Sequence, residues 1–533
     1  MKTFMNLVLN EIIKVWKQTG YRIVIFIMLG MTLLLPIIGL VFSNNFVSYT
    51  AEDEYGSYKK LADEADGIEH EYFSAYAEAY EFFVDNGIAD GWQYRTYSYQ
   101  YAEIFTHERA YKLVSEGLYG AEDVVNWFGI SLSDKSEAEV LYSETNIIRR
   151  ELEKQILMSE SQFIPTVIEE KNEEILSLTE VVTFAEREYN ANKNEENKRA
   201  VVLARLNLNI AETELECLRT INKRNAGPDS WEYNLMKEKM SSYAYSMLSS
   251  FPLSEDEYEM TSFSAAALPY DDYVKDCEGS IDYYRKEFNK CVYAIENNID
   301  IYSANASSAT AEVMESTVSN FGIIMMVIVA GMIAGEYSKG TVRLLLIRPR
   351  SRTQIIASKL VAAATVLVAI TAVSLFLVSI ENLLIYGAGS FFDVISIGDT
   401  PTKIPTFLVT LGAVAVAILT VLADMSLTAL IASLTKKTGT SVTLPLIFKF
   451  AVSAVIIAVG SVLMQMLPEV FGWIIYSPIP YISMTASNIY DGFIGLTGFW
   501  RASIWLGIAY HTAFIALTVW LTILRFNKTE IKG

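Results

Sequence analysis

The fold is decided around residues 335–352, which read GEYSKGTVRLLLIRPRSR. This stretch lies between two apolar segments, and it carries five basic residues and a single acid, Glu336. Lys and Arg are retained on the cytoplasmic side where short loops join membrane spans. Gly340 and Pro349 interrupt the helical periodicity. We therefore predict a cytoplasmic loop, containing a short helix, between two membrane-spanning helices.

Charge is divided unevenly along the 533 residues, of which 52% are hydrophobic and whose net charge is −20. Residues 44–316 contain 24 Lys and Arg against 53 Asp and Glu, a net charge of −29, whereas the rest contains 18 against 9, a net charge of +9. An acidic outer domain beside an apolar, basic remainder is typical of a membrane protein. The acidic domain lacks the basic surface that phosphate binding needs, so we expect no nucleic-acid partner.

Six stretches are long and apolar enough to cross about 30 Å of hydrocarbon as helices. The first, residues 23–42, follows a basic segment that places the N-terminus in the cytoplasm. It lacks a small-residue cleavage site, so we expect an uncleaved anchor. Residues 1–22 before it predict an amphipathic helix in the cytoplasmic interface, or alternatively a polar lead-in. The other five predicted spans are residues 318–334, 355–380, 406–434, 442–467 and 504–524.

The long segment between the first two spans, residues 44–316, is predicted to be a mainly helical extracytoplasmic domain. Residues 136–225 have few helix breakers and predict two long antiparallel helices, with Pro165 as the main interruption and a turn at residues 190–198. A further helix is expected to begin near Tyr270 and to extend towards the second span. An aromatic stripe at helical spacing is interpreted as core; it consists of Tyr72, Tyr76, Tyr80 and Phe83.

Two segments that are rich in Gly or Pro are predicted to lie on the outer side. Residues 387–404 are expected to form a loop, and residues 468–503 are too interrupted for a span and predict re-entrant or interfacial helices. The predicted fold class is therefore an all-α membrane protein with six transmembrane helices, a large, mainly helical extracytoplasmic domain between helices one and two, and both termini in the cytoplasm.

No motif for chemistry on the outer side is evident. His70 and His107 are each followed by Glu, but neither has the second His four residues later that a zinc protease needs. No cluster of metal ligands is present, so we predict no metal site. Cys217, Cys277 and Cys291 are an odd number of cysteines and are predicted to be isolated thiols. We do not expect the chain to be an enzyme by itself.

Two ionisable residues, Asp424 and Lys449, fall inside predicted spans four and five. Each lies 10–13 residues from the basic turn at residues 436–439, which is about 15–20 Å along a helix. A lone charge at such depth costs at least ~2.5 kcal/mol, so we predict a salt bridge between the two spans. The alternative is that Lys449 snorkels while Asp424 faces a polar seam or a dimer interface. Lys359, at the start of span three, is expected to snorkel to the cytoplasmic surface.

The loop resembles the cytoplasmic loop of type-2 ABC exporter permeases, which places a Glu before Gly-Thr, then Leu-Leu, then Pro-x-Ser-Arg, and then a Lys that opens the next span. The matching residues are Glu336, Gly340, Thr341, Leu344, Leu345, Pro349, Ser351, Arg352 and Lys359. The alternative is an ordinary basic loop. The near match of Gly335 and Gly340 to a phosphate-binding loop fails, because Thr341-Val342 stands where Lys-Ser/Thr is needed.

The resemblance implies a plasma-membrane permease subunit without its own nucleotide site. ATP and Mg²⁺ would be held by a separate ABC ATP-binding subunit, two permease subunits would pair within the lipid, and the loop and N-terminal helix would dock the ATPases. The residues that would couple the chain to the ATPase are Glu336, Gly340, Thr341, Arg343, Pro349 and Arg352. The substrate stays open, with a peptide or another amphipathic compound among the classes considered.

A second functional class shares this order of membrane spans and outer domain. Non-transporting membrane scaffolds or receptors, such as the phage-receptor and type VII secretion membrane proteins, also resemble a chain with one span, a large helical outer domain and then five spans. They have no dedicated ATPase. A partner ATP-binding subunit would separate the two interpretations. A membrane-bound enzyme is disfavoured because catalytic motifs are missing.

Overall fold

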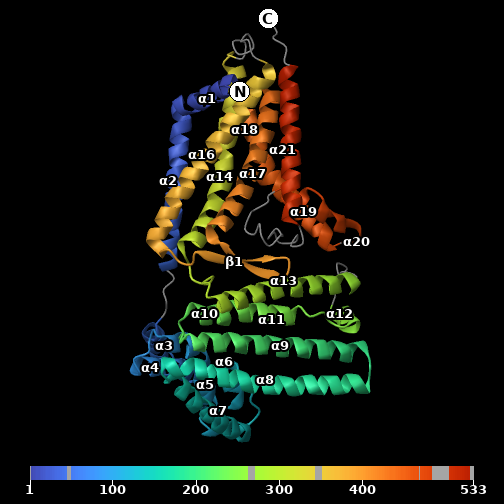
Figure 1. Ribbon diagram of the computed structural model, residues 1–533. Helices are drawn as coiled ribbons and strands as arrows, with labels where there is room; N and C mark the ends of the chain where they lie inside the picture. The colour runs from blue at the N-terminus through green and yellow to red at the C-terminus, as the bar shows by residue number, and fades with distance from the viewer. Residues whose placement is uncertain are drawn as a thin grey trace. The chain divides into compact units, whose positions relative to one another are not determined.

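The computed structural model describes residues 2–44, 50–261, 270–341, 351–466, 468–482 and 503–528 (Figure 1). It divides into two compact units. The first, which we call the membrane unit, comprises Met1–Ser43 and Glu238–Gly533; the second, the inserted unit, is Asn44–Lys237. The sequence predicts the end of the outer domain at residue 316, whereas the compact inserted unit ends at Lys237, so the helices after it group with the membrane helices.

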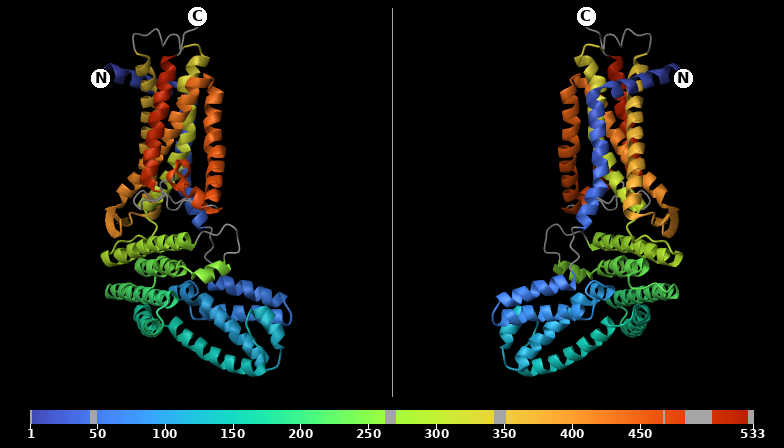
Figure 2. Two further views of the ribbon diagram at one scale, coloured as in Figure 1. Left: turned by 90° about the vertical axis from the view of Figure 1, so that its right-hand side faces the viewer. Right: turned by 90° about the vertical axis from the view of Figure 1, so that its left-hand side faces the viewer.

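The described residues include six helices that are long and apolar enough to span a membrane. They run side by side in the membrane unit (Figures 1 and 2). Each predicted span overlaps one of these six helices, and several helices are longer than predicted. The helices are α2 (Thr19–Asn44), α14 (Ala306–Ser338), α16 (Arg352–Tyr386), α17 (Thr406–Thr435), a fifth composed of α18 (Thr438–Ile447), η2 (Phe448–Val452) and α19 (Ser453–Met466), and α21 (Ile504–Asn527).

Helix α14 is the centre of the membrane unit. In its most apolar window 72% of the residues are buried, compared with 17% in that of α2. It packs against α16, α17 and α18, and its buried Met325, Ile328 and Val329 belong to the main core cluster. Because no hydrophobic force drives helices together within lipid, such tight packing is what holds a bundle of this kind together.

The N-terminal segment forms α1 (Lys2–Lys17), which packs against α16. Its Val8 and Val15 are 3% and 2% exposed and join the main core cluster. The helix is amphipathic, as predicted, and one part of its apolar face is buried in protein. Other apolar residues of α1, such as Met5 and Trp16, remain exposed.

The expectation of a simple loop at residues 387–404 is wrong. Strands β1 (Phe392–Ile397) and β2 (Thr400–Pro405) form an antiparallel hairpin, with Ile397 opposite Thr400. Gly398 has a φ of 65°, which allows the two-residue turn that a tight hairpin needs. The hairpin packs against α13 (Tyr270–Asn297). Helix α13 does not continue into the second span: it ends at Asn297, and Asn305 caps the separate start of α14.

The described part of the predicted outer re-entrant segment consists of short helices. These are α20 (Pro468–Phe471), η3 (Gly472–Tyr476) and η4 (Ile479–Tyr481), and residues 483–502 lie outside the described residues. Two further helices, α11 (Ser241–Ser249) and α12 (Glu255–Thr261), precede α13, and α11 packs against it.

The inserted unit is helical over its described residues. The aromatic stripe of α4 lies in its core, as predicted: Phe83 is 0% exposed, and Tyr76 and Tyr80 stack on Tyr58 with ring centroids 4.8 and 5.7 Å apart. Its helices are α3 (Ala51–Glu64), α4 (Ile68–Asp85), α5 (Trp92–Ser115), α6 (Ala121–Phe128), α7 (Lys135–Ile156), α8 (Glu160–Ala191), α9 (Glu195–Lys223) and α10 (Trp231–Asn234).

Helices α8 and α9 pack against each other as a hairpin, joined at residues 192–194. The prediction that Pro165 interrupts this region is wrong, because Pro165 lies inside α8. The break comes earlier, where Ser159 and Gln162 form a capping box at the start of α8. Pro165 is in the second turn of α8, where it removes the backbone hydrogen bond to Ser161 O but does not end the helix.

Candidate functional site

The described residues of the predicted coupling loop lie at the ends of two neighbouring helices. Glu336 is in the last turn of α14, and Gly340 and Thr341 follow that helix. Gly340 has a φ of 69°, and its N–H donates to Tyr337 O at 3.1 Å, so it ends the helix in a conformation that favours glycine. Arg352 is the first residue of α16. The other two predicted coupling residues, Arg343 and Pro349, lie outside the described residues.

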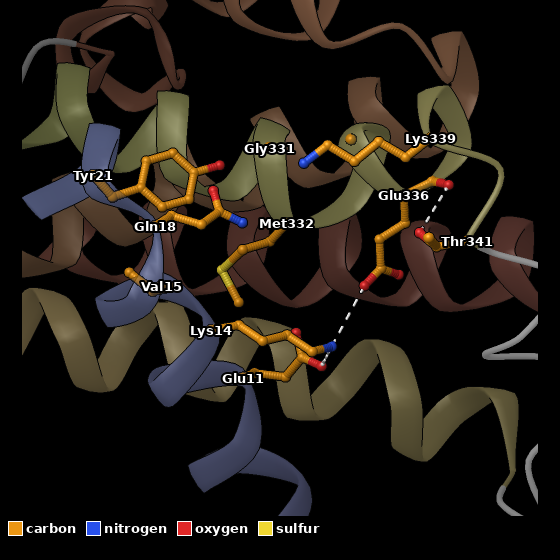
Figure 3. Close-up of a pocket in the computed structure, with 11 residues that line it drawn as sticks. Glu11, Lys14, Val15, Gln18, Tyr21, Gly331, Met332, Glu336, Lys339 and Thr341 are labelled. Atoms are coloured by element: carbon orange, nitrogen blue, oxygen red, sulfur yellow. Dashed lines mark hydrogen bonds and ion pairs between the residues drawn. The ribbon is translucent and has the colours of Figure 1, made fainter.

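Four charged groups form an ion-pair network that joins α1, α14 and α16. Lys359 Nζ lies 2.7 Å from Glu336 Oε1 and 2.9 Å from Glu11 Oε2. Lys14 Nζ lies 2.5 Å from Glu11 Oε1 and 3.7 Å from Glu336 Oε1. We call Glu11, Lys14, Glu336 and Lys359 the ion-pair network; Figure 3 shows three of its members. It links the N-terminal helix to both helices that flank the loop.

The expectation that Lys359 snorkels to the surface is wrong. Its side chain is 2% exposed and is held by two carboxylates. A buried ammonium is tolerated where partners of opposite charge surround it, because their attraction offsets the lost hydration. Sequence reasoning missed Glu11, which sits in an otherwise ordinary amphipathic helix. The sequence does carry one signal: Glu11 is the only acidic residue before Glu52, in a segment that is otherwise basic.

The Glu11 carboxylate is stabilised in its charged form. Burial raises the pKa of Glu11, but the charges of Lys359 and Lys14 and the hydrogen bonds that they donate lower it by more, so its pKa lies below the ordinary value. Glu11 is therefore ionised at neutral pH, and the network holds equal numbers of positive and negative charges.

A pocket of about 300 Å³ lies beside the network, between α1, α14 and the start of α2 (Figure 3). Its lining includes Glu11 and Glu336 from the network, and also Gln18, Tyr21 and Lys339. The approach of α2 to α14 is close here: a Cβ added to Gly331 would lie 1.7 Å from Tyr21 Oη. Glycine is therefore required at position 331 for Tyr21 to keep its place.

Two further contacts tie this end of the bundle together. Arg352 Nη1 donates to Asn527 O at 2.9 Å, and Asn527 Nδ2 donates to Thr353 Oγ1 at 3.1 Å, so the start of α16 is fixed to the end of α21. Lys436, after α17, places its Nζ 5.3 Å from the centre of the Tyr337 ring. Helices α14, α16, α17 and α21 are thus connected at the end that carries the network.

The structure brings Asp424 and Lys449 together. Lys449 Nζ lies 2.5 Å from Asp424 Oδ2, and the side chains of Lys449 and Asp424 are 22% and 20% exposed, respectively. Lys449 belongs to η2, a π-helical turn that interrupts the fifth span. Gly322 of α14 lies against the pair, because a Cβ added there would lie 3.0 Å from Lys449 Nζ. The pair joins the fourth and fifth spans beside the central helix.

No group that could hold a metal ion is found in the described residues. The three cysteines are free thiols, and Cys217 and Cys291 are buried. Burial raises the pKa of Cys291 to about 12, which keeps this thiol protonated and unreactive.

Comparison with known proteins identifies the family. Searches of the curated proteins and of the solved structures returned no significant match. Residues 15–531 match the family model described as ABC-2 family transporter protein. The match begins within α1 and covers all six candidate spans, both flanks of the loop and the inserted unit. The chain therefore belongs to the ABC-2 family of transporter proteins.

Proposed function

We propose that the chain is the membrane-spanning permease subunit of an ATP-driven exporter in the plasma membrane. Membership of the ABC-2 family and six candidate spans support this assignment. The family implies a partnership with an ABC ATP-binding subunit. The sequence has no Walker motif, so ATP and Mg²⁺ belong to that partner and this chain carries no catalytic residue. Two permease subunits complete the exporter, as the family resemblance implies.

The ion-pair network is the observation that carries the coupling role. Lys359 bridges Glu11 of α1 and Glu336 of α14 while it is itself anchored in α16. A displacement of the loop between α14 and α16 is therefore transmitted to α1, α14 and α16 through the buried ammonium of Lys359. Closure of the ATP-binding subunits would move these helices as a rigid group, and in this mechanism the loop transmits force without doing chemistry.

Copurification tests the partner directly. The tagged chain is isolated from its native membrane in mild detergent, and the bound proteins are identified by mass spectrometry. We expect an ABC ATP-binding subunit in stoichiometric amount. A chain that retains its fold and its lipid but repeatedly lacks any ATP-binding subunit would favour a non-transporting scaffold.

Charge reversal in the loop tests the coupling. Arg352→Glu removes the hydrogen bond from Arg352 to Asn527 O and inverts the charge of the docking surface. We expect the ATPase rate of the complex to fall roughly tenfold, the effect of about 1.4 kcal/mol, at unchanged membrane abundance. Lys193→Glu is the matched control, because Lys193 is exposed in the turn between α8 and α9. Equal ATPase rates for Arg352→Glu and the control would remove this loop from the coupling pathway.

A further inference from the structure

A second pocket, of about 230 Å³, lies among α17, η2, η4 and α21. We call it the Asp424 pocket. Its walls are mainly apolar, with four Phe and Tyr rings among them, and two ionisable side chains, Asp424 and His511, also line it. Ionisable groups within membrane spans are costly and mark functional sites by default. The aromatic residues of its lining are Phe448, Tyr481, Tyr510 and Phe514.

The polar groups that the pocket offers are hydrogen-bond acceptors. Lys449 occupies Asp424 Oδ2, and in the described residues Asp424 Oδ1 has no hydrogen-bond partner. His511 Nδ1 lies 3.0 Å from Gly507 O. A carbonyl oxygen only accepts, so Nδ1 carries a proton, and in a neutral ring Nε2 is then left as an acceptor. A ligand that satisfied both groups would have to supply N–H or O–H donors.

The tyrosine hydroxyls do not offer donors in return. Tyr481 Oη donates to Ile475 O at 3.2 Å, and Tyr510 Oη donates to Tyr476 O. With these hydrogens used, the two rings contribute mainly their aromatic faces and edges to the lining, and their centroids are 5.5 Å apart. Such faces attract apolar and cationic groups. Lys449 contacts Asp424 Oδ2 but does not line the pocket, and none of the described lining residues is a Lys or Arg. An anionic ligand would therefore meet Asp424 Oδ1 without a neighbouring cation in the lining, so the pocket disfavours acids and phosphates.

The fifth span contains a π-helical turn beside the Asp424 pocket. The π-helical turn η2 contains both Phe448, which lines the pocket, and Lys449, which holds Asp424. π-Turns within α-helices occur frequently at functional sites, because they reorient side chains at the expense of regular backbone bonding. The turn places the aromatic wall and the partner of the carboxylate side by side.

We infer that the Asp424 pocket binds a small amphipathic amine, with its N–H groups on Asp424 and His511 and its apolar body among the aromatic rings. The volume is below the roughly 300–1,000 Å³ of pockets for drug-sized ligands, which suits one ring with a short aminoalkyl chain. This inference concerns binding and does not depend on the ATP-binding partner. If the chain exports, such amines are the class to test as substrates.

Binding of 2-phenylethylamine to the purified full chain in lipid nanodiscs tests the inference. Saturation-transfer NMR reports the bound ring, and phenylacetate serves as the anion of matched size. We expect saturable binding of the amine, and weaker binding of the acid by roughly tenfold or more. The inference is overturned if the amine shows no saturable signal, or if both compounds bind equally.

Amine binding to variants of the lining tests whether the binding site is this pocket. Ala423 lines it, so Ala423→Leu should fill the space and weaken amine binding roughly tenfold, whereas Ala415→Leu, at an exposed position of the same helix, should change nothing. The neutral double variant Asp424→Asn with Lys449→Gln should weaken binding on the order of 10- to 100-fold. His511→Phe keeps a ring and should weaken it about two- to tenfold.

Correct folding of each variant is checked by its gel-filtration profile and its thermal unfolding midpoint. If Ala423→Leu does not fold, the amine affinity of His511→Phe serves as the test of the site. Wild-type affinity in every folded pocket variant would overturn the assignment of the site. That result would leave the proposed transport function untouched, because the assay contains no ATP-binding subunit.

Discussion

Lys359 is the residue on which the ion-pair network depends. Its side chain is 2% exposed, and its ammonium contacts Glu11 and Glu336, which come from different helices. Removing one partner of a buried ion costs more than removing a surface ion pair, because the ion left behind stays desolvated. With two carboxylates present, loss of either one leaves Lys359 with a single partner and frees one helix.

Glu11→Gln should therefore destabilise the chain in a pH-dependent way. At pH 7 we expect a loss of about 1–3 kcal/mol, because a charged hydrogen-bonded partner is replaced by a neutral one. The pKa of Glu11 is lowered in the folded chain, so its stabilisation is present above the ordinary value of about 4.3 and disappears as the pH falls through the folded value. The thermal unfolding midpoints of wild type and variant should thus converge under acidic conditions.

The control for this measurement is Glu139→Gln, an exposed glutamate of α7. It should not alter the midpoint at either pH, because surface carboxylates contribute little. The lower pH should be about 3.5, which is below the ordinary pKa of a glutamate. If the difference in unfolding midpoint between wild type and Glu11→Gln stayed constant from neutral pH to that value, Glu11 would act through packing instead of charge.

The charged residues show what the sequence can and cannot predict about the site. The depth of Asp424 and Lys449 along their helices follows from counting, so spacing puts them at matched depth and favours their pairing over a snorkelling Lys449. The partners of Lys359 cannot be found in this way, because Glu11 is 348 positions away in sequence and no local pattern links the two. The pairing of Lys359 depends on how α1 packs against α14 and α16, which no spacing in this sequence encodes.

At the scale of the elements, helix α14 depends on a residue without a side chain. Gly331 lets Tyr21 of α2 lie against it, since a Cβ there would be 1.7 Å from Tyr21 Oη and 3.0 Å from Tyr21 Cζ. Gly335 lies one turn further along the same helix, and a Cβ added to it would have no atom within 4 Å. Substitution of Gly331 therefore tests the close approach of the two helices, whereas substitution of Gly335 tests helix propensity alone.

Gly331→Ala should destabilise the chain by about 1–3 kcal/mol, as inserted methyl groups do in packed cores. Gly335→Ala should be neutral or stabilising by up to about 1 kcal/mol, because alanine is the better helix former. Tyr21→Phe removes the hydroxyl that clashes, so it should recover most of the loss in Gly331→Ala. Thermal unfolding midpoints of the four combinations of Tyr21→Phe and Gly331→Ala measure the coupling. Additive effects of the two substitutions would contradict a contact between these residues.

The elements differ in how well the sequence predicts them. Long apolar runs specify membrane helices by composition alone, so all six spans can be placed. The β1–β2 hairpin escapes prediction because Gly398 and the prolines near it are also typical of loops, and only pairing distinguishes the two. Pro165 is a misleading signal, because its effect depends on where the helix starts. The π-turn η2 has no local signature and arises where Lys449 meets Asp424.

At the level of the whole molecule, the membrane unit is discontinuous in sequence and the inserted unit is contained within it. Residues 45–305 separate the helix of the first span from that of the second, so whichever side of the membrane they occupy is opposite to that of α1. An even number of spans returns the chain to the side on which it began. The basic flanks of the spans favour the cytoplasm for that side, and this orientation is part of the proposed function.

Cysteine labelling of intact cells tests this topology. In a chain whose partly exposed Cys277 is replaced by Ser, Lys193→Cys marks the exposed turn between α8 and α9, and Lys528→Cys marks the residue after α21. A membrane-impermeant maleimide should label Lys193→Cys in intact cells, and should label Lys528→Cys only after the membrane is opened. The reverse pattern would put the loop flanked by Glu336 and Arg352 outside, where no ATP-binding subunit could reach it. Labelling of both positions in intact cells would mean an even number of spans between them, and one of the apolar helices from α14 to α21 would then have to lie outside the bilayer.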